Sequence, residues 1–194
     1  MNYKRIILWG LIITAIVLPY AGLFIVIKHF AKERLLIKNA EFVIVDKQKM
    51  ALQMYDFKGN LTFSAPIACG RNLGNKKEKG DLRTPEGIFH VIGIEDASGW
   101  SHDFKDGNGM IDSAYGPWFI RLDTPGHKGI GIHGTHAPES LGTRATEGCI
   151  RLKNEDVVKL KEKVHVGMTV VITPSTDDVT ADIAGNENEE EKKH

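Results

Sequence analysis

The sequence predicts a mainly β fold, a sandwich or barrel with one or two short helices, preceded by an N-terminal transmembrane helix. Three observations predict it. Short alternating or β-branched segments are separated by Gly- and Pro-containing turns between residues 41 and 173. Only one convincing helical pattern occurs in this region, and it comes late. N-terminal to the predicted strands, residues 6–27 form an uncharged apolar run, long enough for a helix to span about 30 Å of hydrocarbon.

The N-terminal run predicts an uncleaved anchor over residues 6–27, after a short cytoplasmic N-terminus over residues 1–5. Basic residues lie on both sides of the run, so charge alone does not fix its orientation. The alternative is a cleaved signal peptide with a possible cleavage point at Ala21, although the residues before Ala21 match such a site poorly. Residues 28–39 are predicted as a basic connector.

The folded domain is predicted over residues 40–174, and its strands follow from the apolar alternation and the turn residues between them. The predicted strands cover residues 41–46, 50–56, 61–69, 87–94, 118–122, 129–133 and 166–173. One helix is predicted from Asn154, a suitable cap, to Val164, with Val157 and Leu160 on the same face as Val164. The polar tail over residues 175–194 is predicted to be disordered.

Composition excludes several classes of function. Lys plus Arg and Asp plus Glu both number 25, so the net charge is zero, which argues against a dedicated nucleic-acid binder. No Gly-rich phosphate loop follows a strand. The two cysteines, Cys69 and Cys149, form no CxxC pair and have no zinc-type spacing. The cysteine spacing therefore indicates no zinc site, and we expect Cys69, in an apolar strand, to be a buried thiol.

A histidine and a cysteine mark the candidate site. His133 ends an alternating strand in which Ile132 faces the core, so His133 faces the other side, and Gly134 then allows a tight turn. Cys149 follows Gly148, which permits an unusual backbone angle and a close approach of substrate.

A cysteine needs a nearby base or cation to act as a thiolate, and His133 is the candidate base for Cys149. Backbone N–H groups near Cys149 can serve as an oxyanion hole. Taken singly, Cys149 is equally compatible with a structural thiol, and His133 with a buried polar residue that has its hydrogen bonds. The pair together with the flanking glycines favours thiol catalysis.

The segments Ile132-His-Gly-Thr135 and Thr146-Glu-Gly-Cys-Ile-Arg-Leu152 resemble the signature of the L,D-transpeptidase catalytic domain, also called the YkuD domain. Residues 80–90 resemble the Thr-Pro-x-Gly-x-Phe turn and strand of this family, and residues 115–118 resemble its aromatic segment before the histidine strand. The resemblance covers roughly residues 41–173.

The resemblance implies a reaction. Cys149 would attack the peptide bond before the terminal D-Ala of a peptidoglycan tetrapeptide stem, and an amine of a second stem would accept the acyl group from the thioester. His133 would transfer the protons. Arg151 would organise the loop or bind a substrate carboxylate. The resemblance further implies that the reaction needs no metal and no organic cofactor. It also implies carbapenem β-lactams as covalent inhibitors and a location on the outer side of a bacterial inner membrane.

The supporting or substrate-binding residues that we predict surround this pair in the sequence. They are Gly148, Arg151, Glu147, Gly134, Thr135, His136, Tyr115 and Trp118. Trp118 is equally plausible as a core residue.

One position departs from the family pattern, which has His where this chain has Glu147. A carboxylate beside Cys149 disfavours the thiolate. Glu147 could orient a loop group, or bind the ammonium of the acceptor, or leave part of the missing role to His136. Two alternatives to a transpeptidase stay open: an L,D-carboxypeptidase or endopeptidase of the same fold, and a catalytically silent wall-binding module.

Overall fold

The computed structural model describes residues 41–105, 107 and 109–191, with Tyr20, Leu23, Phe24 and residues 26–28 before them. The chain divides into two compact units, residues 1–40 and 41–194. Most of the predicted transmembrane helix over residues 6–27, and the connector after it, lie outside the described residues. Within the part of the chain that the structure describes, no helix has the length and apolar character to cross a membrane.

The second unit is built on one mixed sheet of eight strands in the order β11-β9-β8-β5-β12-β1-β2-β3. Its members are β1 (Glu41–Asp46), β2 (Ala51–Asp56), β3 (Leu61–Pro66), β5 (Gly87–Asp96), β8 (Trp118–Leu122), β9 (Gly131–His133), β11 (Ile150–Arg151) and β12 (Thr169–Thr173). Two pairs are parallel, β1 with β12 and β9 with β11, and the other neighbours are antiparallel.

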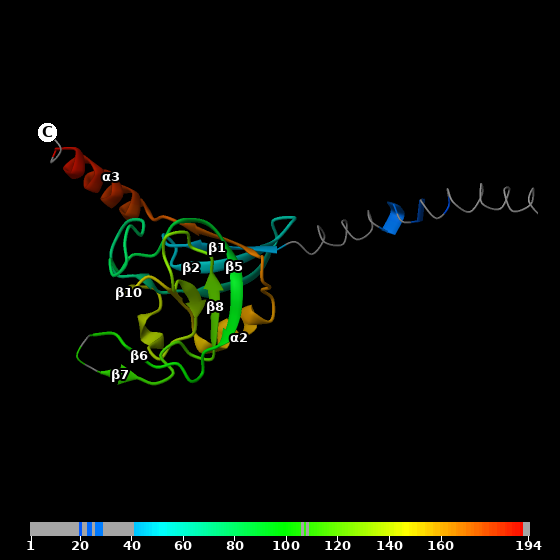
Figure 1. Ribbon diagram of the computed structural model, residues 1–194, viewed down its shortest axis with the longest axis horizontal. Helices are drawn as coiled ribbons and strands as arrows, with labels where there is room; N and C mark the ends of the chain where they lie inside the picture. The colour runs from blue at the N-terminus through cyan, green and yellow to red at the C-terminus, as the bar shows by residue number, and fades with distance from the viewer. Residues whose placement is uncertain are drawn as a thin grey trace, which may run out of the picture. The chain divides into compact units, whose positions relative to one another are not determined.

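The sheet is open and strongly twisted, because β11 and β3 are its two edges and β1 and β2 cross the direction of β5 and β8 (Figure 1). The mainly β prediction is therefore confirmed, but the form is a curled half-barrel and not a sandwich or closed barrel. Alternation along a strand indicates which side chains are buried and says nothing of which distant strand pairs with it.

Short elements complete the unit. Two small sheets pair β4 (Cys69–Gly70) with β10 (Arg144–Thr146), and β6 (His102–Asp103) with β7 (Met110–Ile111). A 3₁₀ turn, η1, covers Pro138–Ser140. The strand predicted over residues 61–69 is thus two strands, β3 and β4, in different sheets.

The core lies where one face of the curled sheet meets α2 (Asn154–Lys161). Alternate residues of the strands are fully buried, as in Val43 and Val45 of β1, and α2 adds Val157 and Leu160. The predicted helix is confirmed, although Lys153 and not Asn154 is its cap residue.

The segment after Ser175 forms a helix, α3 (Thr176–Glu191), so the prediction of a disordered tail from residue 175 is wrong for this stretch. Its first turn is held by Asp178, whose side chain is fully buried. The Asp178 carboxylate accepts hydrogen bonds from Gly74 N (2.8 Å) and Arg144 Nη2 (2.6 Å) and lies 3.2 Å from Lys47 Nζ. Composition could not indicate that one acid of this polar segment has buried cationic partners.

Candidate active site

His133 ends β9, and Cys149 directly precedes β11, the parallel strand beside β9. In the pairing of β9 with β11, Ile132 lies opposite Ile150, and both are fully buried in the core. Because side chains alternate along a strand, His133 and Arg151, which are also paired, point to the other face. Cys149, immediately before β11, shares that face. The strand reading of His133 is confirmed.

His133 is held on three sides. Its Nδ1 lies 2.6 Å from the carbonyl oxygen of Gly134. Since a carbonyl oxygen only accepts, Nδ1 carries the proton and Nε2 keeps its lone pair. The ring of Phe119 stacks on the imidazole at 5.6 Å and 7°, and the ring of Tyr115 meets it edge-on at 4.9 Å. The imidazole is therefore fixed with Nε2 as its free basic nitrogen.

The surroundings keep this imidazole neutral. Burial lowers the pKa of His133 to about 3, since His133 is only 2% exposed, and the Gly134 carbonyl opposes this only in part. The positive charge of Arg151 and the nearby His136 and His102 lower the pKa further.

Cys149 is half-buried, and its Sγ lies 3.3 Å from the carbonyl oxygen of Gly129. Burial raises the pKa of the thiol to about 11; a hydrogen bond from the Gly131 N–H acts against this, and the Glu147 carboxylate adds to it. Arg121 and Arg151 lower the pKa of the thiol. At neutral pH the site therefore holds a neutral thiol and a neutral imidazole.

The turn that carries the thiol is tightly fixed. Gly148 has φ +134°, and a Cβ there would lie 2.7 Å from the Arg83 carbonyl oxygen, so only glycine fits. The Thr146 hydroxyl donates to the Cys149 carbonyl (2.6 Å) and accepts from Gly148 N (3.1 Å). The Gly148 N–H therefore already has an acceptor. The sequence suggests that N–H groups near Cys149 form an oxyanion hole, but this one is not free to do so.

Thr84 connects the Thr-Pro-Glu-Gly segment to this turn. Its hydroxyl donates to the Gly148 carbonyl oxygen (2.9 Å) and accepts from Gly70 N (2.8 Å), and Thr84 is fully buried. The segment at residues 84–87 therefore supports the residue before the cysteine, and two motifs far apart in the sequence form one structure.

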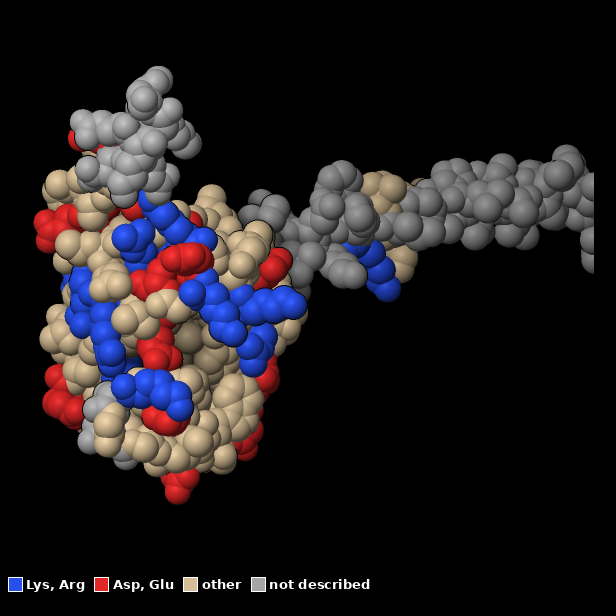
Figure 2. Space-filling view, turned by 60° about the vertical axis from the view of Figure 1, so that its left-hand side comes forward, with Lys and Arg blue, Asp and Glu red and all other residues tan. Residues whose placement is uncertain are grey.

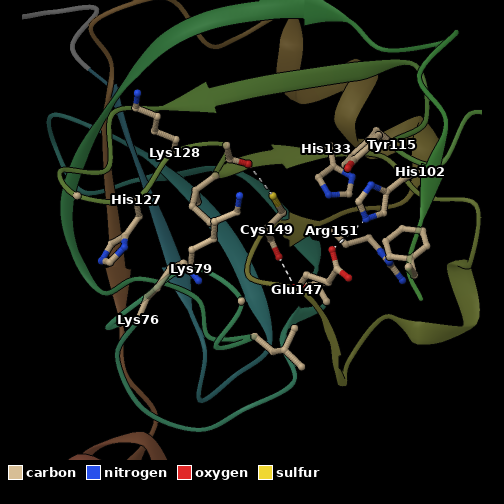
Figure 3. A pocket seen from close by; sticks show the side chains of 17 residues that line it. Lys76, Lys79, His102, Tyr115, His127, Lys128, His133, Glu147, Cys149 and Arg151 are labelled. Carbon is tan, nitrogen blue, oxygen red and sulfur yellow. Dashed lines mark hydrogen bonds and ion pairs between the residues drawn. The ribbon is translucent and has the colours of Figure 1, made fainter. Parts of the chain in front are cut away.

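The two candidate catalytic residues open on a pocket of about 710 Å³ (Figure 3). Three other predicted residues also line it, namely Arg151, Glu147 and Tyr115. Burial raises the pKa of Tyr115 to about 12, so its hydroxyl stays protonated. The structure thus brings five of the predicted residues to one cavity.

Glu147 lines the pocket and contacts the hairpin formed by β6 and β7. Its Oε2 lies 2.9 Å from Nε2 of His102 in β6, and the two side chains are 38% and 31% exposed. The pair links the turn before Cys149 to β6.

Arg151 lines the pocket, and part of its guanidinium is engaged by protein groups. The residue is 4% exposed, its Nη1 donates to the Ser140 hydroxyl (3.0 Å), and its guanidinium lies 5.7 Å from the Phe104 ring centroid. The buried Nε has no hydrogen-bond partner within the described residues. A buried N–H without a partner is costly, so a ligand acceptor there would be favoured.

Thr135 and His136 do not line the pocket and instead hold the loop after His133. Thr135 N donates to the Asn154 side chain (2.7 Å), so Asn154 of α2 anchors this loop instead of capping its helix. The Nδ1 of His136 donates to the Ala114 carbonyl (3.1 Å).

Trp118 lies outside the pocket. It packs against the hydrophobic core, and Lys161 Nζ lies 4.6 Å from its ring centroid. The core reading of this residue therefore fits the structure.

Several lining residues escaped the sequence reasoning. They are His102, Phe104, Lys76, Lys79, His127 and Lys128. The one available signal is the Gly-His-Lys-Gly stretch at residues 126–129, directly before the histidine strand, because it lies only a few residues from His133 in the sequence.

Residues 40–172 match the YkuD L,D-transpeptidase catalytic domain. "Probable L,D-transpeptidase YbiS" from Escherichia coli is 54% identical over 141 residues, which cover 67% of this chain and 44% of that protein. Three Bacillus relatives are 29–37% identical, and the matches span 51–65% of their length.

Solved structures share the fold. L,D-transpeptidase 3 from Mycobacterium tuberculosis has a TM-score of 0.54 at 18% identity, covering 69% of this chain and 61% of that one. The catalytic domain of the Enterococcus faecium L,D-transpeptidase has a TM-score of 0.51 at 21% identity, covering 70% and 98%. From its motifs, its curled sheet and its match over residues 40–172, the chain belongs to the YkuD L,D-transpeptidase catalytic domain family.

Proposed function

We propose that this chain is an L,D-transpeptidase that acts on peptidoglycan stem peptides through a thioester on Cys149. The observation that carries the proposal is that His133 at the end of β9 and Cys149 directly before the adjacent strand β11 share one face and one pocket. Membership of a family of cysteine enzymes supports it.

The first half-reaction follows from the neutral resting pair. The thiol proton of Cys149 passes to Nε2 of His133 as the sulfur attacks the carbonyl carbon of the bond before the terminal D-Ala. The carbon–nitrogen bond then breaks, and the imidazolium returns the proton to the leaving amine. D-Ala departs and a thioester remains. Starting from neutral groups, the site needs no preformed thiolate.

The second half-reaction reverses the roles. The amine of a second stem loses a proton to His133 and attacks the thioester carbon, and the carbon–sulfur bond breaks. The sulfur then recovers its proton from His133. Water in place of the amine would give a carboxypeptidase. No cofactor is required, because acyl transfer needs only a nucleophile, a base and hydrogen-bond donors.

Arg151 suits the carboxylate of the leaving D-Ala. Arg151 lines the pocket, and its buried Nε–H has no hydrogen-bond partner within the described residues. A guanidinium binds carboxylates with fixed geometry. The charge of Arg151 also favours the thiolate of Cys149 as that thiolate forms.

The substrate sets the proposed location. Peptidoglycan lies outside the bacterial inner membrane, so residues 6–27 would anchor the chain there with the catalytic domain on the outer side. β-Lactams are the proposed inhibitors, since solved relatives include LdtMt1 in complex with imipenem and L,D-transpeptidase 3 with a faropenem-derived adduct.

Product analysis tests the proposal. The full chain is incubated with a disaccharide tetrapeptide, and products are separated by mass. Cross-linked dimers are expected. Tripeptides alone would indicate a carboxypeptidase, and an unchanged substrate would favour a silent wall-binding module. Incubation with imipenem provides a second measure: an adduct on Cys149 is expected, and its absence would count against an enzyme.

A further inference from the structure

The pocket has one basic side. Four cationic side chains line it, namely Lys76, Lys79, Lys128 and Arg151, and Glu147 is its single carboxylate among the described lining residues. In Figure 3, three of these cations, the lysines, lie on one side of the sulfur, and His133, Arg151 and His102 lie on the other. Figure 2 shows Lys and Arg side chains gathered on the face of this unit turned toward the viewer, with Asp and Glu side chains between them.

Two of the lysines are free to meet a ligand. Lys76 is buried and paired with Asp81 (2.6 Å), so its charge is matched. Asp81 also accepts from the backbone N–H groups of Lys77 and Arg83, and these partners hold the pKa of Asp81 well below its usual range. Lys79 and Lys128 are exposed, and neither has an ion pair within the described residues.

The chemistry fixes which part of the substrate reaches this side. His133 must give a proton to the leaving nitrogen, so that nitrogen lies on the His133 side of the sulfur. The acyl portion extends from the same carbonyl carbon in the other direction. It therefore runs across Cys149 toward Lys79 and Lys128.

We propose that Lys79 and Lys128 form a carboxylate-binding subsite for the acyl portion of the donor stem, an inference that rests on the proposed function. The ligand is a peptide with free carboxylates on the residues before the scissile bond. Lysine ammonium groups act as mobile point charges, so the subsite selects negative charge more than a fixed geometry. Arg151, on the opposite side, remains for the leaving group.

Two donor peptides distinguish binding of carboxylates at this subsite from general binding of the stem. Both are tetrapeptide stems with a free terminal D-Ala carboxylate, and they differ only in whether the carboxyl groups of the acyl portion are free or amidated. Release of D-Ala is measured for the full chain, for the double variant K79Q/K128Q and for a matched double variant K58Q/K163Q. Lys58 and Lys163 are exposed and lie outside the pocket.

We expect K79Q/K128Q to lower kcat/KM about five- to tenfold with the free-acid donor, mainly through KM, as two exposed ion pairs permit. With the amidated donor the loss should shrink to less than about twofold. High salt should reduce the advantage of the free-acid donor in the unmodified chain. An equal loss with both donors, or the same loss in K58Q/K163Q, would overturn the subsite.

A binding measurement makes the inference independent of turnover. Titration calorimetry with the Cys149→Ala chain should show tighter binding of the free-acid stem than of the amidated stem, and K79Q/K128Q should remove that preference. Equal affinities would refute the subsite even where the reaction proceeds. Absence of D-Ala release from both donors would refute the proposed function instead.

Discussion

The carboxylate of Glu147 lies 2.9 Å from Nε2 of His102, so the residue in the position of the family histidine is joined to β6. Of the three roles considered for Glu147, this geometry favours orientation of a loop group. His136 does not line the pocket and instead contacts Ala114.

Replacing Glu147 by Gln should make the thiol more acidic. The negative charge of Glu147 raises the pKa of Cys149, so its removal should move the pH midpoint of iodoacetamide alkylation below that of the unmodified chain. Glu155→Gln, at the exposed start of α2, should leave the midpoint in place. A midpoint in Glu147→Gln equal to that of the unmodified chain would show that the carboxylate does not act on the sulfur.

Thr84→Val should cost about 1–3 kcal/mol in the free energy of unfolding, because it leaves Gly70 N and the Gly148 carbonyl without their buried partner. Urea denaturation measures this cost. The matched change Thr62→Val, at an exposed edge-strand hydroxyl, should cost less than about 0.5 kcal/mol. Equal costs for the two variants would contradict the structural link between Thr84 and the turn that carries Cys149.

Gly131→Ala should lower the rate of D-Ala release at least about tenfold, since small misplacements of catalytic groups are costly. A Cβ at residue 131 would collide with the Phe119 ring, which stacks on His133. Gly99→Ala, where a Cβ meets open space, is the control and should keep normal rates. A normal rate in Gly131→Ala would mean that the Phe119 stack does not position His133.

Stability should fall on acidification from about pH 6.5 toward pH 3. The unfolded chain binds a proton at His133 near pH 6.5, and the folded chain binds it only near pH 3, so protonation favours unfolding across this window. The slope contributed is at most about 1.4 kcal/mol per pH unit. Denaturant midpoints of the full chain and of His133→Asn measure it. The same slope in both proteins would contradict the buried neutral imidazole.

Asp178→Asn should loosen the start of α3 and cost about 3–5 kcal/mol, because Arg144 loses its paired carboxylate and Lys47 keeps only Glu86 of its two. Thermal unfolding gives the cost. Asp177→Asn, at an exposed neighbour, should cost less than about 0.5 kcal/mol. If both changes have similar effects, the ion pairs of Asp178 with Lys47 and Arg144 do not hold this helix.

The sequence allowed the local parts of this structure to be predicted. Alternation placed His133 on the face opposite Ile132, and helical periodicity placed Val157 and Leu160 in the core, because each pattern depends on neighbours a few residues away.

Long-range contacts escaped prediction for the converse reason. The parallel pairing of β1 with β12, the docking of Asp178 and the pairing of Glu147 with His102 join residues far apart in the chain. No periodicity encodes such partners. The sequence does not identify Lys79 and Lys128 as pocket residues either. In sequence, a charged loop residue that lines a pocket looks the same as one that only contacts solvent.

The most direct measurement is the mass of the full chain, quenched during incubation with a tetrapeptide stem and then mapped by peptide digestion. We expect Cys149 to carry the tripeptide acyl group, with D-Ala released, and we expect no such adduct in Cys149→Ala. Turnover of the stem at the normal rate by Cys149→Ala, or an acyl group on another residue, would contradict the assignment of Cys149 as the nucleophile.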